Sequence, residues 1–178
     1  DRAAIPTFDV NSLPDLKPTS PINLSLAGKS LTLEPEDEES FVARKFSDTE
    51  SLLALHRFAW LENPDSIDIA PWVNVIFKAW VEKFDVNEAG WAWQPYTVAE
   101  RLVNVINYSK QVGLPGEKKK SLAFLARHGP AIFDRLEYLG DKHVGNHLAN
   151  NGRGLYLGGL ELGIENWANI GGQILIEE

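Results

Sequence analysis

The chain has 178 residues, of which 44% are hydrophobic, so it is long and apolar enough to bury one core. Seventeen Lys and Arg against 25 Asp and Glu give a net charge of −8, which excludes general binding to nucleic acids or anionic membranes. The absence of cysteine excludes disulfides and thiolate metal sites, and no apolar run reaches the roughly 20 residues that span a bilayer.

The first 47 residues are expected to form an extended arm. They contain five of the ten prolines and show little helical periodicity. Apolar and polar residues alternate in places from Asn23 to Leu33, on both sides of Gly28, which predicts one weak hairpin. We therefore divide the chain into an extended N-terminal arm, residues 1–47, and a helical region, residues 48–178.

Helical periodicity begins at Asp48, a candidate N-cap, and the first helix is expected to continue to the stop signal Asn63-Pro64. A second helix follows Pro71. Its predicted inward stripe is Trp72, Val75, Ile76, Ala79 and Trp80.

Thr97-Val98-Ala99-Glu100 has the pattern of a capping box and predicts the start of a long third helix, which ends at Gly113-Leu114-Pro115. Further helices are predicted at about 117–127, 130–139, 146–162 and 165–176. The fold class is therefore all-α. Antiparallel helices joined by short turns suit either a bundle or a partial α/α toroid, and the pattern alone does not choose between them.

The densest group of polar residues on an otherwise apolar helix lies between 143 and 153. Asn146, Asn150 and Arg153 fall at i, i+4 and i+7, so two amides and a guanidinium would share one helical face. Near a helix N-terminus, such groups suit a carboxylate or sugar hydroxyls. The alternative is that Asn146 caps the helix while its neighbours satisfy buried backbone groups.

Two other features of this segment have simpler interpretations. His143 and His147 have the four-residue spacing of metal ligands, but the acidic residue of a zinc-protease motif is missing, so we predict no metal and no other cofactor. Gly152, Gly154, Gly158 and Gly159 would weaken a helix, so we expect them where helices approach closely.

A second cluster combines Trp91, Trp93, Tyr96 and Arg101. Aromatic rings beside a guanidinium would form a surface on which a sugar can stack; alternatively, both tryptophans fill the core. His56 lies on a helix rich in Leu and Trp, where it is either a site residue or a structural histidine.

Three stretches together resemble the N-terminal helical domain of the heparinase II/III-like polysaccharide lyase family, and they occur in that family's order. They are LHRFAWL at 55–61, WQPYTVAERLVN at 93–104 and GNHLANNGRGL at 145–155. The last of these, followed by LELG at 160–163, is the most specific. The resemblance extends from about residue 21 to the end of the chain.

The resemblance implies an incomplete α/α toroid, followed in the full protein by a C-terminal β-sandwich that acts as its partner. Such enzymes cleave uronate-containing polysaccharides by β-elimination, in which the carboxylate is neutralised, a base removes the C5 proton and an acid protonates the leaving oxygen. By motif, Asn146 would bind the carboxylate, and His147 would help to neutralise it or handle the proton. Arg101, Tyr96 and Arg153 would contact substrate.

In this family a tyrosine acts as the acid and the β-sandwich contributes a histidine. Both are expected beyond residue 178, so this chain alone should be inactive. Heparan-type glycosaminoglycans, alginate and exopolysaccharides all remain candidate ligands, and the periplasm or cell envelope is favoured over the cytoplasm. A non-catalytic carbohydrate-binding or scaffolding domain in surface-polysaccharide assembly is the alternative. A glycoside hydrolase ranks last, because no spacing singles out a pair among Glu88, Glu100, Asp134 and Glu161.

Overall fold

The computed structural model describes residues 6–85, 90–136 and 146–177. It is mostly helical with one two-stranded sheet, which confirms the all-α class. None of the helices in these ranges is long and apolar enough to cross a membrane. The helices are α1 (Glu38–Val42), α2 (Thr49–Arg57), α3 (Ala70–Phe84), α4 (Pro95–Gln111), α5 (Lys118–Leu125), α6 (His128–Phe133), α7 (Asn146–Leu162) and α8 (Glu165–Glu177), with 3₁₀ helices η1 (Ala59–Glu62), η2 (Pro64–Ile67) and η3 (Trp91–Trp93).

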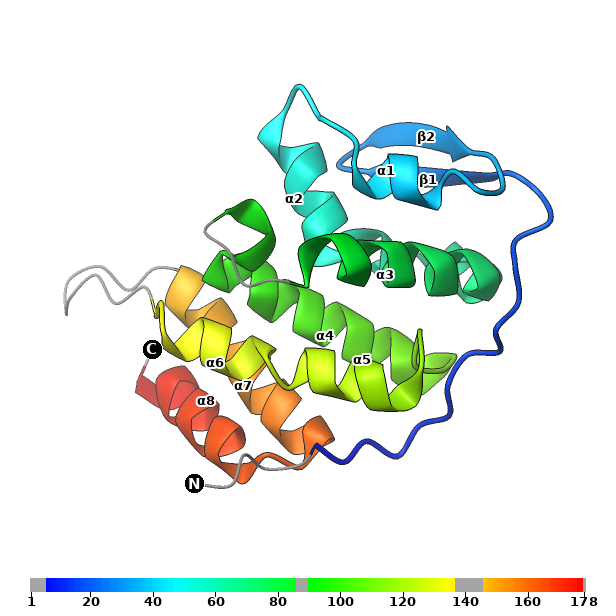
Figure 1. Ribbon diagram of the computed structural model, residues 1–178. Coiled ribbons are helices and arrows are strands. Elements are labelled where there is room, and N and C mark those ends of the chain that lie inside the picture. The colour runs from blue at the N-terminus through cyan, green and yellow to red at the C-terminus, as the bar shows by residue number, and fades with distance from the viewer. Residues whose placement is uncertain (1–5, 86–89, 137–145, 178) are drawn as a thin grey trace.

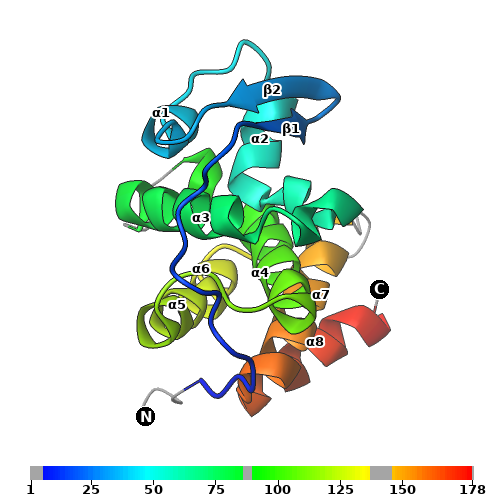
Figure 2. The same cartoon turned by 90° about the vertical axis from the view of Figure 1, so that its right-hand side faces the viewer.

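Helix α4 lies in the middle of the molecule. The β-hairpin and α1 are at one end, the antiparallel pair α7 and α8 is at the other, and α4 packs against both α2 and α7 (Figures 1 and 2). The side chains of α4 therefore reach both the aromatic core and the start of α7.

The N-terminal arm runs along one side of the helices and is held by backbone hydrogen bonds (Figure 2). The amide of Thr7 donates to the carbonyl of Leu162 (2.8 Å), and the amide of Leu13 donates to the carbonyl of Leu114 (2.8 Å). The predicted hairpin is present as β1 (Ile22–Leu26) and β2 (Lys29–Leu33). Its two-residue turn has positive φ at both positions, 48° and 81°, as a twisted hairpin requires.

The first helix begins as predicted and ends earlier. The side chain of Asp48 accepts a hydrogen bond from the amide of Ser51 (2.8 Å), which confirms the N-cap. Helix α2 ends at Arg57, however, because Phe58 adopts a left-handed conformation with φ 54°. The predicted stop at Asn63 instead caps η2, where its side chain accepts from the amide of Asp65 (3.1 Å).

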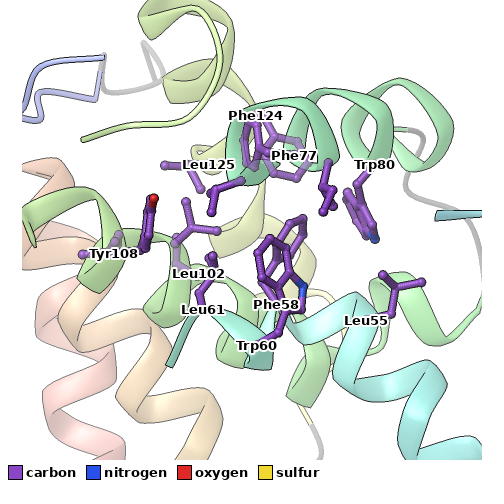
Figure 3. Close-up of a cluster of buried hydrophobic side chains, with 14 of the residues drawn as sticks. Leu55, Phe58, Trp60, Leu61, Phe77, Trp80, Leu102, Tyr108, Phe124 and Leu125 are labelled. Carbon is purple, nitrogen blue, oxygen red and sulfur yellow. The ribbon is translucent and has the colours of Figure 1, made fainter. Parts of the chain in front are cut away.

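Phe58 tolerates this conformation because its ring is completely buried among aromatic rings (Figure 3). The ring centroids of Trp60, Phe77 and Trp80 lie 5.7, 6.0 and 5.6 Å from that of Phe58. A left-handed conformation is unfavourable for a bulky residue, so the surrounding core must enforce it.

The predicted capping box at the start of the third helix is wrong. Helix α4 begins three residues earlier, with Pro95 as its first residue and Gln94 as N-cap; the Gln94 side chain accepts from the amide of Thr97 (3.0 Å). Thr97 is completely buried inside the helix. Proline is common at the first position of a helix. An N–H at that position has no partner within the helix, so proline loses nothing by lacking one.

Helix α7 has the predicted bounds, and its glycines lie where helices approach closely, as expected. A Cβ on Gly154 would come within 2.9 Å of the Ala99 backbone in α4, and one on Gly159 within 2.2 Å of the Ala168 backbone in α8. Only glycine permits such contacts without moving a helix. These glycines set the position of α7, and hence of its first turn.

Candidate functional site

Two residues of the first turn of α7, Asn146 and His147, are exposed to solvent. The imidazole of His147 packs against Tyr96, with ring centroids 4.9 Å apart and planes inclined by 57°. Tyr96 belongs to the first turn of α4, so the starts of two helices meet here. The two proposed catalytic residues are thus at the surface and not sealed in the core.

The next turn of α7 holds this junction together. The Nδ2 atom of Asn150 donates to the carbonyl of Tyr96 (3.1 Å), and its Oδ1 atom accepts from Nη2 of Arg153 (3.0 Å). Arg153 also forms an ion pair with Glu100 of α4. The predicted face of amides and a guanidinium therefore exists, but Asn150 and Arg153 use their polar groups within the protein, where they position the first turn.

Arg57, the last residue of α2, is a cation beside this junction that the predicted site does not include. Its guanidinium carbon lies 4.7 Å from the centroid of the Tyr96 ring. Within the described ranges Arg57 has no ion-pair partner, and its Nε atom is buried without a hydrogen bond. The sequence left His56 open as either a site residue or a structural histidine. Adjacent helical residues point about 100° apart, so Arg57 and His56 face different surroundings.

Helix α4 fixes the end of α2 through two polar side chains. Nη1 of Arg101 donates to the carbonyl of His56 (3.0 Å), and Nδ2 of Asn104 donates to the carbonyl of Arg57 (3.0 Å). The last carbonyls of a helix lack partners within the helix, so side chains of α4 supply them. These bonds hold Arg57 in place above Tyr96.

Arg101 is completely buried, whereas the prediction expected it to contact a sugar. Its guanidinium carbon lies 4.4 Å from the ring centroid of Trp80 and 5.1 Å from that of Trp93. It also donates to the carbonyl of Ala92 (2.7 Å) and to Nε2 of His128 (3.0 Å). Burial lowers its pKa to about 9. Arg101 is therefore a positioning residue beneath the surface.

His56 and His128 are buried as well, and both are neutral. Nδ1 of His56 accepts from the Trp80 indole (3.2 Å), and burial, followed by the charge of Arg101, lowers its pKa to about 4. The same causes, burial first, lower the pKa of His128 well below its usual value. His56 is thus in the core and not on the candidate surface.

The two tryptophans predicted as a stacking pair are separated by the fold. Trp93 is buried, and its indole donates to the carbonyl of Phe84 (2.6 Å). Trp91, in contrast, is 51% exposed. The alternative that tryptophan fills the core holds for Trp93 alone.

The sequence also raised a two-histidine metal site at His143 and His147 and a carboxylate pair among Glu88, Glu100, Asp134 and Glu161. Across the described ranges no three His, Cys, Asp or Glu side chains gather in a way that could hold a metal ion. His143 and Glu88 lie outside those ranges. Glu100 and Glu161 are each paired with a cation, Arg153 and Lys110 respectively.

No family model, no curated protein and no solved structure matches the chain.

Proposed function

We propose that this chain is the helical, substrate-holding part of a polysaccharide lyase that acts on a uronate-containing acidic polysaccharide. The proposal is carried by one observation: Arg57, Tyr96 and His147 lie in contact in a row. Each residue comes from a different one of the three stretches that resemble the lyase family. Together with Asn146 they form what we call the acidic-sugar surface.

The chemistry of this surface suits a sugar carboxylate. Asn146 offers an amide N–H, His147 an imidazole and Arg57 a guanidinium, and all three can donate to a carboxylate. The ring of Tyr96 lies between the last two. The N-terminus of the 17-residue helix α7 adds a favourable dipole for an anion.

In β-elimination the main electrostatic task is to stabilise the charge that develops when the C5 proton is removed. A carboxylate held by donors accepts this charge more readily, because its own negative charge is already partly neutralised. In the proposed mechanism Asn146 and Arg57 bind the carboxylate, and His147 neutralises it or handles the proton. The surrounding helices would form a partial α/α toroid, against which a β-sandwich of the same protein closes the cleft.

A binding experiment tests the surface directly. Calorimetric titration of the chain with alginate or heparan-type oligosaccharides should show binding. His147→Ala and Asn146→Ala should each abolish most of the affinity without changing the unfolding midpoint. Unchanged affinity in both variants would refute the proposal.

The reaction itself distinguishes the lyase from a non-catalytic carbohydrate-binding or scaffolding domain. The full protein, incubated with acidic polysaccharides, should release products with the ultraviolet absorbance of an unsaturated uronate. Oligosaccharide binding without such a product across a broad panel would favour the non-catalytic alternative.

A further inference from the structure

A second candidate site lies farther along α4, beside η1 and η2. It is a hollow of about 340 Å³, which falls within the range of small-molecule pockets, about 300–1,000 Å³. Its polar lining comes from the end of η1, the following turn and the last turns of α4. The residues used below are Glu62, Asn63, Asn104, Asn107, Tyr108 and Gln111.

Two polar groups in this lining are buried and lack partners. Asn104 and Tyr108 are 2% and 3% exposed, and within the described part of the chain neither Oδ1 of Asn104 nor the Tyr108 hydroxyl forms a hydrogen bond. Buried polar atoms normally have a partner, supplied by protein, water or ligand. Two residues with unpaired polar atoms that line one hollow therefore call for partners from outside the protein, either water or a ligand.

The donor and acceptor roles of these groups follow from their surroundings. Asn104 uses its Nδ2 atom on the carbonyl of Arg57 (3.0 Å), so its Oδ1 atom is the free acceptor. Burial raises the pKa of Tyr108 to about 12, so its hydroxyl stays protonated and can both donate and accept. Asn104 and Tyr108 are four residues apart on α4 and so share one helical face, and an acceptor and a hydroxyl on one face complement a ligand that carries hydroxyl groups.

The rim of the hollow indicates that this ligand is uncharged. Asn107 and Gln111 are exposed amides on successive turns of α4, and Asn63, between η1 and η2, adds a third amide. Glu62 is the one charged residue among those described in the lining, so an anion would be repelled.

We propose that this hollow binds an uncharged, hydroxyl-rich sugar unit through Asn104, Asn107, Tyr108 and Gln111. The inference does not rest on the acidic-sugar surface and can hold if that proposal fails. The two sites share α4: Tyr96 and Asn107 are eleven residues apart, or about 16 Å along the helix axis. A polysaccharide that alternates acidic and neutral sugar units would suit both sites.

Two-dimensional ¹H–¹⁵N NMR titration with cellobiose, maltose and N,N′-diacetylchitobiose tests the proposal. At least one of them should shift the side-chain amide signals of Asn104, Asn107 and Gln111, and sodium glucuronate should not.

Tyr108→Phe removes only the hydroxyl and should weaken binding at least about five-fold, while stability stays equal or rises because an unpaired buried group is lost. Tyr156→Phe, an exposed tyrosine on α7, is the matched control and should bind normally.

A second variant covers the case in which Tyr108→Phe fails to fold. Asn107→Ala combined with Gln111→Ala changes exposed side chains alone and should also weaken binding. Arg57→Gln should leave neutral-sugar binding intact, which separates this site from the acidic-sugar surface. The proposal is overturned if no neutral sugar in the panel shifts these amide signals, or if both variants bind as well as the unmodified chain.

Discussion

Nε of Arg101 donates to Nε2 of His128 across 3.0 Å, inside the core. This bond requires His128 to carry its own proton on Nδ1, which faces the Phe124 carbonyl at 3.2 Å. Arg101 has no carboxylate partner within the described ranges, so the faces of Trp80 and Trp93 and the backbone carbonyls stabilise its charge. The polar interior of this protein therefore depends on histidines that stay uncharged.

We expect the protein to lose stability as the pH falls below 6.5. The pKa of His56 is about 4 in the folded protein and about 6.5 when unfolded, so the unfolded state takes up the proton first. The contribution of neutral His56 to the free energy of unfolding is fully present above pH 6.5 and is lost as the pH falls towards 4. His56 alone should cost about 2 kcal/mol between pH 7 and 5, and His128 acts in the same direction.

Urea unfolding at several pH values measures this effect. The exposed carboxyl of Asp48 has its pKa lowered to about 2, mainly by its hydrogen bond to Lys29, so it titrates below the window in question. His56→Gln should flatten the dependence between pH 5 and 7. A slope equal to that of the unmodified chain would show that His56 is not the responsible group.

Replacement of Arg101 should destabilise the protein severely. Arg101→Leu leaves the carbonyls of His56 and Ala92 unpaired in the core, which we expect to cost about 3–5 kcal/mol in the free energy of unfolding. Arg127→Leu removes a guanidinium that is 44% exposed and should cost about 1 kcal/mol or less. Similar losses for the two variants in chemical denaturation would contradict the structural role assigned to Arg101.

Alanine substitutions at two adjacent glycines of α8 should change the stability of the protein in opposite directions. A Cβ on Gly171 would lie 2.3 Å from the backbone nitrogen of Tyr156, so Gly171→Ala must push α8 away from α7. A Cβ on Gly172 would meet only the Tyr156 ring, at 3.5 Å, so Gly172→Ala should stabilise the helix by up to about 1 kcal/mol. Thermal unfolding of the two variants measures this. If both midpoints shift in the same direction, α7 and α8 are not this close.

Arg57 should contribute to binding through its charge. If it binds a sugar carboxylate, Arg57→Gln should weaken the affinity for acidic oligosaccharides about ten-fold or more, as expected for a lost charge-assisted hydrogen bond. Lys119→Gln removes an equal charge from an exposed position on α5 and serves as control. Equal weakening in both variants would mean that net charge, and not position, governs binding.

The sequence predicted the features that depend on local patterns. Periodicity and glycine placement were enough for the bounds of α7 and for its close packing, and Asp48 was recognised as a cap. The early end of α2 could not be predicted, because a left-handed phenylalanine is stabilised by distant rings and not by its neighbours in the chain.

The candidate site was predicted only in part, for a related reason. Polar residue types indicate chemistry but not depth, so Arg101 was taken for a surface residue although the core encloses it. Trp91 and Trp93 are two residues apart and could not be distinguished, yet one is exposed and the other buried. Arg57 became a candidate because α2 and α4 meet in the structure, which places its guanidinium over the Tyr96 ring.

The left-handed turn at Phe58 has a consequence for how the molecule responds to distant change. This residue ends α2 and also fills the centre of the aromatic cluster, and Arg57 immediately precedes it. Repacking of these buried rings would thus shift the half-buried guanidinium of Arg57. Laboratory evolution could thus alter the proposed acidic-sugar surface through substitutions at interior positions.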